Sequence, residues 1–190
     1  ITLDIYTDLK EFYTPANGFS RLHLCRRYGK LHILKSLQPF YSSQEFYKQL
    51  LLKEFNIGYQ LDHPNIRHTL GWEKNDLLGN YIVLEYIDGI PLTTFIEQGK
   101  LTQALAYKFI TEICNALQYI HSKQLIHKDL KPNNILITHN GNNVKLIDFG
   151  LADCDDYEIL KIPAGTEKYL APEQLNPNAT LDCRTDIYSL

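Results

Sequence analysis

Four side chains that could carry out phosphoryl transfer fall within one short stretch of the sequence. Asp129 is a carboxylate that could accept a proton, and Lys131 is a cation two residues later. Asn134 and Asp148 supply oxygen atoms, the ligands that Mg²⁺ prefers. Phosphoryl transfer requires little covalent chemistry from a protein and much well-placed charge, so this combination predicts a phosphotransferase.

A predicted β-hairpin should position the two metal-ligating side chains. The apolar runs 135–137 and 144–147 are joined by a polar segment with an Asn-Gly pair at 140–141, which is typical of a hairpin. Because the strands are antiparallel, the residue before the first strand should lie beside the residue after the second. These residues are Asn134 and Asp148, so an amide and a carboxylate should meet. The alternative is two polar residues at the ends of a hairpin, without a function.

Three motifs resemble those of eukaryotic-type protein kinases. The run 127–134, His-Lys-Asp-Leu-Lys-Pro-Asn-Asn, is similar to their catalytic loop. Asp-Phe-Gly at 148–150 is similar to their magnesium loop, and Ala-Pro-Glu at 171–173 to the motif that closes their activation segment. The three motifs occur in the order and at the spacing of the family. The resemblance implies that His127 and Phe149 are packing residues.

The resemblance also implies a role for each residue of the catalytic stretch. Asp129 would accept the proton of the substrate hydroxyl, and Lys131 would neutralise the phosphoryl group in transfer. Asn134 and Asp148 would hold the metal ions that accompany ATP. The expected ion is Mg²⁺, with Mn²⁺ as the alternative.

The N-terminal third of the chain predicts a buried ion pair. In the run 31–37, alternation puts Lys35 on the same strand face as apolar residues. Ser42 and Glu45 form a capping-box pattern that should open a helix, with Glu54 in its apolar stripe. A charge buried alone is destabilising, so Lys35 and Glu54 should pair. The full predicted stripe is Phe46, Leu50, Glu54, Ile57 and Leu61.

The alternative for these two charges is a snorkelling lysine and a glutamate at the edge of the stripe. Protein kinases resemble the paired arrangement, because their strand lysine binds the α- and β-phosphates of ATP and is held by a glutamate of the following helix. The resemblance therefore implies that Lys35 and Glu54 belong to the ATP site.

The loop expected to cover the phosphates departs from the family pattern. Kinases usually have three glycines there, because the backbone must bend sharply and approach the phosphates closely. In the run 15–22 the glycine positions hold Pro15, Asn17 and Ser20. Asn17-Gly18 still favours a β-hairpin at this place. We expect the loop to form but to bind nucleotide more weakly or differently.

Further residues are assigned to ATP by the same resemblance. Ile33 stands where the family usually has alanine, and its longer side chain should crowd the roof over adenine. Leu84 would guard the back pocket, and the backbones of Glu85 and Ile87 would bond to adenine. The expected ATP-binding residues are Asn17, Gly18, Phe19, Ser20, Leu22, Ile33, Lys35, Leu84, Glu85, Ile87, Leu136 and Asp148.

The expected phosphoryl acceptor is a serine or threonine hydroxyl of a protein substrate. Lys131 and the run 165–173, Gly-Thr-Glu-Lys-Tyr-Leu-Ala-Pro-Glu, resemble Ser/Thr kinases, whereas tyrosine kinases differ at both places. The resemblance implies that Thr166 hydrogen-bonds near Asp129 and Lys131 and shapes the acceptor pocket. Without the family, Gly-Thr would indicate only a turn.

The activation segment between Gly150 and Gly165 contains no serine or threonine, and its one hydroxyl residue, Tyr157, lies amid acidic residues. Lys128 replaces the arginine that in many kinases pairs bidentately with an activation-loop phosphate, and a lysine is only a point charge. We therefore expect a constitutively arranged loop in which an acidic side chain stands in for phosphate. A solvated acidic loop without that role is the equal alternative.

Composition describes an ordinary globular protein. The chain has 190 residues, 44% hydrophobic content and a formal net charge of −3, so it can bury a substantial core. No basic patch indicates nucleic acid, and no apolar run approaches the roughly 20 residues of a membrane span. Its 4 cysteines are scattered, with neither a metal-type pair nor a disulfide framework, which favours a reducing, cytoplasmic location.

The predicted fold is α+β, with the two-lobe plan of protein kinases. Residues 1–84 should form the N-lobe, an antiparallel sheet with one helix, and residues 85–190 a mainly helical, incomplete C-lobe. Apolar periodicity predicts a long helix over 101–122. This plan assigns the nucleotide lid and the Lys35–Glu54 pair to the first lobe, and the hinge, the catalytic loop, the magnesium loop and the activation segment to the second.

The run 182–190 resembles the start of the large central helix of the kinase C-lobe. By this resemblance Asp186 would bind the backbone of the catalytic loop. The body of the helix is missing, which should expose apolar surface. We expect either a fragment of a longer protein or a naturally short chain whose dimer covers the incomplete lobe.

Three classes of function follow from these residues. The first is an active Ser/Thr protein kinase, favoured by the set Lys35, Glu54, Asp129, Asn134 and Asp148. The second is a pseudokinase that acts as a scaffold, favoured by the altered phosphate loop and the incomplete lobe. The third is a small-molecule phosphotransferase of the aminoglycoside kinase type, which is disfavoured by the Lys-Pro, Gly-Thr and Ala-Pro-Glu motifs.

Overall fold

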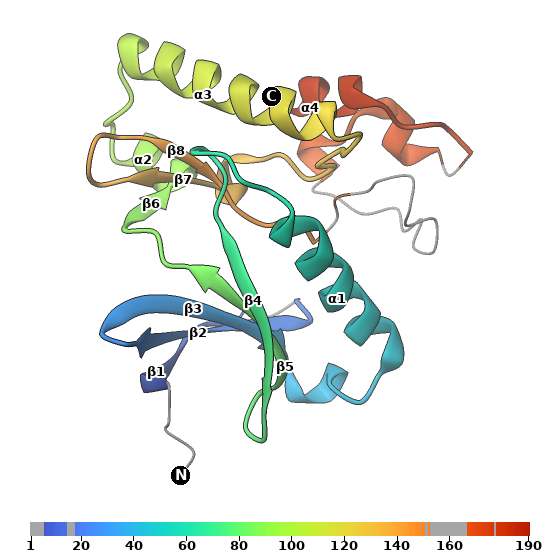
Figure 1. Ribbon diagram of the computed structural model, residues 1–190. Helices are drawn as coiled ribbons and strands as arrows, with labels where there is room; N and C mark the ends of the chain where they lie inside the picture. The colour runs from blue at the N-terminus through green and yellow to red at the C-terminus, as the bar shows by residue number, and fades with distance from the viewer. Residues whose placement is uncertain (1–5, 15–17, 151, 153–166, 177) are drawn as a thin grey trace. The chain divides into compact units, whose positions relative to one another are not determined.

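The chain forms two compact units in a computed structural model (Figure 1). Unit 1 consists of residues 1–60 and 68–86, and unit 2 of residues 61–67 and 87–190. The sequence placed a single boundary after residue 84, whereas the structure divides the chain at three points. The described residues are 6–14, 18–150, 152, 167–176 and 178–190.

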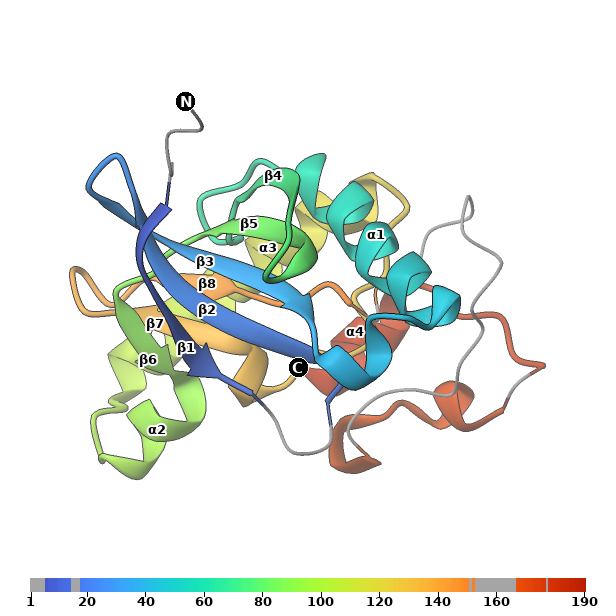
Figure 2. The ribbon, with the colours of Figure 1, turned by 90° about the horizontal axis from the view of Figure 1, so that it is seen from below.

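Unit 1 is built on a five-stranded antiparallel sheet in the order β1-β2-β3-β5-β4 (Figure 2). Helix α1 (Glu45–Tyr59) packs on one face of this sheet. An antiparallel sheet with one helix is what the sequence predicted for the first lobe. The strands are β1 (Tyr6–Tyr13), β2 (Ser20–Arg27), β3 (Lys30–Leu37), β4 (Thr69–Asn75) and β5 (Gly79–Glu85).

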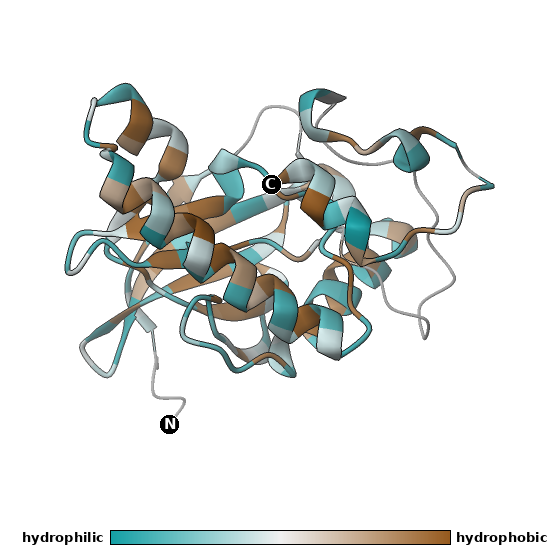
Figure 3. Ribbon diagram, turned by 90° about the horizontal axis from the view of Figure 1, so that it is seen from above, coloured by the Kyte–Doolittle hydropathy of each residue, from teal (hydrophilic) through white to brown (hydrophobic). Residues whose placement is uncertain are grey.

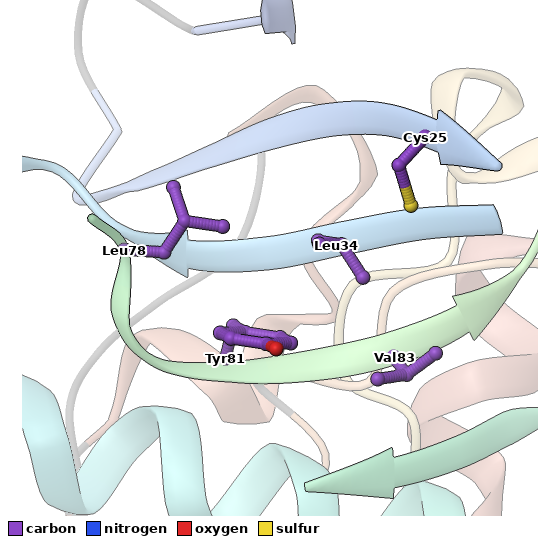
Figure 4. Close-up of a cluster of buried hydrophobic side chains, with 5 residues drawn as sticks. All are labelled: Cys25, Leu34, Leu78, Tyr81 and Val83. Carbon is purple, nitrogen blue, oxygen red and sulfur yellow. The ribbon is translucent and has the colours of Figure 1, made fainter. Parts of the chain in front are cut away.

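Both faces of the sheet are buried along β3 and β5. On the face covered by α1, Ile33 and Leu37 of β3 lie with Ile82 and Leu84 of β5. Successive side chains of a strand alternate between faces, so their neighbours point to the opposite face. The alternation predicted for β3 is therefore present, although apolar residues fill both faces. The second cluster consists of Cys25, Leu34, Leu78, Tyr81 and Val83 (Figure 4).

Helix α1 begins differently from the sequence prediction. A 3₁₀ turn, η1 (Pro39–Tyr41), precedes it, and the Ser42 hydroxyl donates to the Pro39 carbonyl at 2.7 Å. Proline favours the start of a helical turn, so Ser42 is used to close this turn. The N-cap of α1 is Gln44, which makes no side-chain capping bond. The predicted capping box of Ser42 and Glu45 was therefore wrong.

The buried side of α1 includes Leu50, Glu54 and Ile57, as the apolar stripe predicted. Phe46 is instead 44% exposed, and Leu61 lies beyond the end of the helix. The stripe is thus shorter at both ends than the sequence pattern indicated, and Glu54 lies near its middle.

Unit 2 combines helices with a three-stranded sheet in the order β6-β7-β8. Among the described residues, no helix has the length and apolar content that crossing a bilayer requires. The elements are β6 (Gly89–Pro91), α2 (Leu92–Glu97), α3 (Gln103–Ser122), η2 (Pro132–Asn134), β7 (Ile135–Thr138), β8 (Val144–Leu146), η4 (Glu167–Tyr169), η5 (Pro172–Leu175) and α4 (Cys183–Ser189).

Helix α3 is the long helix that the sequence predicted over 101–122. Thr102 caps it, because its hydroxyl accepts the Leu105 N–H at 3.2 Å. The colouring of Figure 3 shows apolar and polar residues interleaved along α3. Its buried residues recur every three or four positions, as the apolar periodicity requires: Phe109, Ile113, Ala116, Leu117 and Ile120.

Helix α3 also holds the predicted β7–β8 hairpin in place. The ammonium of Lys108 donates to the carbonyls of Gly141 at 2.6 Å and Asn142 at 2.8 Å, in the turn of the hairpin. The Glu112 carboxylate accepts the Val144 N–H at 2.6 Å, at the start of β8. One helix therefore fixes both the turn and the strand that leads to the magnesium-loop motif.

Replacing Gly89 by alanine is expected to destabilise the protein by about 1–3 kcal/mol, the usual cost of overpacking. A Cβ at Gly89 would lie 2.4 Å from the Ile137 carbonyl oxygen and 3.0 Å from the Thr138 Cα, which are backbone atoms of β7. These atoms can move only if the sheet opens. Urea denaturation would measure the loss. At Gly71 an added Cβ meets nothing within 4 Å, so Gly71→Ala is the matched control; equal stability of the two variants would contradict the prediction.

Candidate active site

The catalytic loop brings three of the predicted residues together. The Asn134 amide nitrogen donates to the Asp129 carbonyl at 2.8 Å and to Oδ2 of the Asp129 carboxylate at 3.0 Å. The Lys131 ammonium lies 3.4 Å from the same Oδ2. An amide and a cation thus converge on one carboxylate oxygen. The side chains of Lys131 and Asp129 are 23% and 15% exposed, so a ligand can reach them.

Asp186 of α4 fixes the backbone of this loop. Its Oδ2 accepts the His127 N–H and its Oδ1 the Lys128 N–H, both at 2.9 Å. The sequence predicted this contact. His121 of α3, whose Nε2 lies 2.7 Å from Oδ2, was not predicted, because no local pattern links it to Asp186. Burial alone would raise the pKa of Asp186, but these hydrogen bonds outweigh it and the pKa lies below its usual value.

His127 is a packing residue, as the sequence predicted. It is fully buried, and its ring centroid lies 5.0 Å from that of Phe149. Its Nδ1 accepts the Asp129 N–H at 3.2 Å, so the ring also steadies the backbone at Asp129. Burial lowers the pKa of His127, against the opposing influence of the nearby carboxylates.

Acidification below about pH 6.5 is expected to destabilise the protein through His127. The unfolded chain takes up a proton near that pH, whereas folded His127 does so only at lower pH, because its pKa is lowered. The unfolded state then binds more protons, and stability falls by up to about 1.4 kcal/mol per pH unit. His23 and His63, whose pKa burial also lowers, act in the same direction.

Denaturation of the protein and of His127→Phe across this pH range would check the expectation. The variant should show a shallower dependence of unfolding free energy on pH. Phe149→Leu is the matched control, because it disturbs the same ring contact and removes no titrating group. Parallel curves for His127→Phe and the unmodified protein would contradict the prediction.

The register of the β7–β8 hairpin places Asn134 one residue away from a direct pair with Asp148. The Ile147 N–H donates to the Asn134 carbonyl at 2.9 Å, so Asn134 faces Ile147 and Asp148 comes next. The predicted pairing is therefore off by one residue, because the ladder extends one residue past β8. Asp148 then adopts a φ of 73°, and its Oδ1 accepts the Gly150 N–H at 3.0 Å.

The chemistry of these two side chains suits a magnesium ion. The described hydrogen bonds of the Asn134 side chain involve its nitrogen, which orients the amide and keeps the oxygen for a cation. Asp148 contributes a carboxylate. Mg²⁺ is usually held by one or two such groups together with phosphate oxygens. No cluster of three or more His, Cys, Asp or Glu side chains suited to a metal occurs within the described ranges.

In unit 1, Lys35 of β3 and Glu54 of α1 form the predicted ion pair. The Lys35 ammonium lies 2.7 Å from Oε1 of Glu54, and each side chain is only 7% exposed. A buried charge is tolerated when it is paired, and removing one partner is strongly destabilising. The snorkelling alternative for Lys35 is therefore excluded.

The described part of the phosphate-covering loop is held by Gln38, which the sequence did not predict. The Gln38 N–H donates to the Phe19 carbonyl at 2.8 Å, and its Nε2 donates to the Gly18 carbonyl at 2.6 Å. The Phe19 ring lies 5.3 Å from the Tyr47 ring of α1. Asn17, another predicted contact, lies outside the described residues. Hydrogen bonds and an aromatic contact thus hold this side of a loop that lacks the usual glycines.

The strand register agrees with the hairpin predicted for this loop. The last pair of the β1–β2 ladder is Tyr13 with Leu22. Ser20 is the first residue of β2, and Leu22 packs against the core on the α1 face. The Asn17-Gly18 turn itself stays a prediction, because Asn17 lies outside the described residues.

The residues assigned to adenine in unit 1 are buried or already engaged. Ile33 and Leu84 pair across β3 and β5, and each is nearly inaccessible. The Glu85 N–H donates to the His68 carbonyl at 3.0 Å, and its carboxylate accepts the His68 N–H at 3.0 Å. The Glu85 N–H, one of the two backbone groups expected to bond to adenine, is therefore already engaged.

The remaining predicted residues belong to unit 2. Ile87 is buried, and Leu136 is half-buried on the face of β7 opposite to its buried neighbours. Thr166, expected beside the acceptor, lies outside the described residues. The same holds for the acidic segment around Tyr157. The described ranges thus contain Asp129, Lys131, Asn134 and Asp148 but not the predicted acceptor contact.

The chain is similar to several proteins that are named as serine/threonine-protein kinases. The probable serine/threonine-protein kinase CPE1738 of Clostridium perfringens (strain 13 / Type A) is 34% identical over 170 residues, which are 87% of this chain and 24% of that protein. Serine/threonine-protein kinase PrkC of Bacillus subtilis (strain 168) is 34% identical over 163 residues, 83% of this chain and 24% of that protein. Serine/threonine-protein kinase PknB of Mycolicibacterium smegmatis is 33% identical over 186 residues, 91% of this chain and 29% of that protein.

The chain thus spans about a quarter of the length of these relatives. The sequence model of one family, described as the protein kinase domain, matches residues 18–190. This match runs from the phosphate-covering loop to the end of α4 and takes in both units. The chain therefore belongs to the protein kinase domain family.

Proposed function

We propose that this chain transfers the γ-phosphoryl group of ATP to serine or threonine hydroxyls of protein substrates. The observation that carries the proposal is the convergence of Asn134 and Lys131 on the Asp129 carboxylate. A carboxylate held in one orientation beside a cation suits a reaction that depends on placed charge. The names of the three relatives described above, two serine/threonine-protein kinases and one probable serine/threonine-protein kinase, support the choice of acceptor.

In this proposal Asp129 accepts the proton of the attacking hydroxyl. Lys131, whose ammonium lies 3.4 Å from that carboxylate, stabilises the charge on the phosphoryl oxygens. Asn134 keeps the carboxylate oriented through its amide nitrogen. Asn134 and Asp148 would hold Mg²⁺, or Mn²⁺ in its place, which neutralises phosphate charge when bound.

Lys35 is proposed to bind the α- and β-phosphates, with Glu54 holding its ammonium in place. Residues 1–84 would then supply the nucleotide lid and the Lys35–Glu54 pair, and residues 85–190 the hinge to adenine and the catalytic groups. Thr166 is proposed to contact the acceptor near Asp129. The further ATP contacts are proposed to be Asn17, Gly18, Phe19, Ser20, Leu22, Ile33, Leu84, the Glu85 carbonyl, Ile87 and Leu136.

The second candidate function is that of a pseudokinase that binds partners without transferring phosphate. It is favoured by Pro15, Asn17 and Ser20 at the usual glycine positions and by buried Ile33 where the family usually has alanine. A small-molecule phosphotransferase is favoured by no observation of its own. The two candidate functions can be distinguished by experiment, because only a kinase transfers the labelled γ-phosphoryl group of ATP to a protein.

The test has two parts. A thermal-shift titration with Mg-ATP measures nucleotide binding, and labelled ATP then reports transfer to a protein rich in serine and threonine. Acid-stable label on serine or threonine supports the kinase. Stabilisation without transfer supports the scaffold, and label found only on an added aminoglycoside supports the small-molecule enzyme.

The predicted dimer and the cytoplasmic location stay predictions. In unit 2 a cavity of about 200 Å³ is lined mainly by apolar side chains of α2, α3 and the catalytic loop, among them Phe109, Ile113, Leu130 and Pro132. Sedimentation of the purified protein at several concentrations would decide whether two copies associate. A single monomeric species at every concentration would remove the dimer from consideration.

A further inference from the structure

A buried glutamine connects the segment after the Ala-Pro-Glu motif to the catalytic loop. Gln174 of η5 is only 9% exposed. Its Nε2 donates to the Lys128 carbonyl at 2.9 Å, and its Oε1 accepts the Ala171 N–H at 3.0 Å. Both ends of the amide are therefore used. Neither bond can be lost without leaving a buried polar group without a partner, which native proteins rarely tolerate.

The bond from Gln174 reaches Lys128, whose backbone has an unfavourable conformation. Lys128 has a φ of 69°, in the left-handed region that residues with a side chain rarely adopt. Asp186 accepts its N–H, and Gln174 donates to its carbonyl. That carbonyl belongs to the peptide between Lys128 and Asp129. Gln174 therefore fixes the plane of the peptide from which Asp129 extends.

Helix α4 is bonded both to the segment 169–174 and to the catalytic loop. The Thr185 hydroxyl donates to the Glu173 carboxylate at 2.9 Å, and the Ser189 hydroxyl donates to the Tyr169 carbonyl at 2.7 Å. Asp186 of the same helix holds the catalytic loop. Gln174 bonds directly to Lys128 and so links the two segments that α4 contacts. Helix α4, the segment 169–174 and the catalytic loop are therefore each bonded to the other two.

We propose that Gln174 is a positioning residue for Asp129, through which the placement of residues 171–174 is transmitted to the catalytic base. The inference rests on the proposed function, because it takes Asp129 as the base. Gln174 does not contact the reacting atoms. It acts through the Lys128–Asp129 peptide, so its loss changes where the carboxylate points and leaves the nucleotide-binding residues unchanged.

Part of this arrangement could have been found in the sequence. Gln174 stands three residues after Ala171 with a proline between them, which is half of a capping-box pattern. That pattern accounts for the bond to the Ala171 N–H. The bond to Lys128 spans 46 residues and has no local signature.

The decisive variant is Gln174→Glu. It keeps the size of the side chain and the acceptor for the Ala171 N–H, but it places a carboxylate oxygen against the Lys128 carbonyl. Near pH 8 we expect kcat to fall about 10- to 100-fold, the scale of a small misplacement of a reacting group. The KM for ATP should stay within about twofold, because no ATP-binding residue is altered.

Lowering the pH towards 6 should rescue this variant. Burial raises the pKa of the introduced carboxyl, and its protonated form can donate to the Lys128 carbonyl as the amide does. The carboxylates of Asp186, Glu173 and Asp129 and the rings of His121 and His127 face this region in the unmodified protein too, so the quantity compared is the ratio of the two activities at each pH. A ratio that rises as pH falls is expected from positioning and not from a general loss of packing.

Amide hydrogen exchange gives a readout that needs no activity. In Gln174→Leu, peptides that cover residues 127–130 should exchange faster than in the unmodified protein. Thr185→Val is the matched control, because it breaks the bond to Glu173 but leaves Lys128 untouched. Melting temperatures of all three variants, recorded at each pH, separate unfolding from misplacement.

The outcomes of the inference and of the proposed function are distinct. If Asp129→Ala still transfers phosphate, the proposed function is wrong whatever the Gln174 variants do. If Asp129→Ala is inactive and Gln174→Glu keeps the kcat and pH profile of the unmodified protein, only the positioning role is overturned. Unchanged exchange in Gln174→Leu would overturn it as well.

Discussion

Asp129→Ala is expected to lower kcat for phosphoryl transfer by about 10²- to 10⁴-fold, the contribution of a positioned general base. The Asp129 carboxylate is the point on which the Asn134 amide and the Lys131 ammonium converge. Removing it deletes the proton acceptor but none of the residues proposed to bind ATP. Stabilisation by Mg-ATP should therefore stay close to that of the unmodified protein. Steady-state transfer of label and a thermal-shift titration measure the two quantities separately.

The matched control for this variant is Asp76→Ala. Asp76 is an exposed aspartate in the turn between β4 and β5 of unit 1. Its replacement removes the same charge and should leave kcat unchanged. Transfer by Asp129→Ala at the rate of Asp76→Ala would refute the assignment of the base.

Asp186→Ala is expected to lower the free energy of unfolding by about 2–6 kcal/mol. The carboxylate is only 1% exposed and accepts the backbone N–H groups of His127 and Lys128. Each buried donor left without an acceptor costs about 1–3 kcal/mol. His121 also loses its partner. Urea denaturation would measure the loss.

The dependence of this loss on pH follows from the lowered pKa of Asp186. The stabilisation is present above the pKa of the unfolded carboxyl, about 3.9, and is lost as pH falls through the folded value. The difference between Asp186→Ala and the unmodified protein should therefore shrink in strong acid. Asp182→Ala is the control, because Asp182 is the half-exposed N-cap of α4 and its carboxylate accepts the Arg184 N–H of its own helix. A larger loss for Asp182→Ala than for Asp186→Ala would contradict the argument.

Sequence reasoning succeeded where the periodicity of a strand or a helix decides which face a residue occupies. Alternation along β3 put Lys35 on an apolar face, and the period of α1 put Glu54 on its buried side, so their ion pair could be predicted. The hairpin that leads to Asp148 was predictable for the same reason. Its register was wrong by one residue, because Ile137 pairs with Val144 and Ile135 with Leu146, so the apolar run 144–147 extends one residue past the run 135–137.

Most contacts between distant segments could not be predicted from the pattern of the residues, and the contact of Asp186 with the catalytic loop was implied only by the family resemblance. His121 and Asp186 are 65 residues apart, and Gln38 lies 20 residues from Gly18. No periodicity links such positions, since each side chain reaches its partner only after the elements have packed. The capping box at Ser42 failed for a local reason instead, because the preceding proline opens a turn that competes for the same hydroxyl.

The bonds from Asp186 to the catalytic loop have a consequence for synthesis of the chain on the ribosome. The Lys128 N–H and its acceptor are 58 residues apart, so the loop emerges long before the residue that fixes it. Until α4 has been made, the left-handed backbone at Lys128 lacks its N–H acceptor. A nascent chain arrested before Asp186 should carry Asp129, Lys131 and Asn134 and still transfer no phosphate.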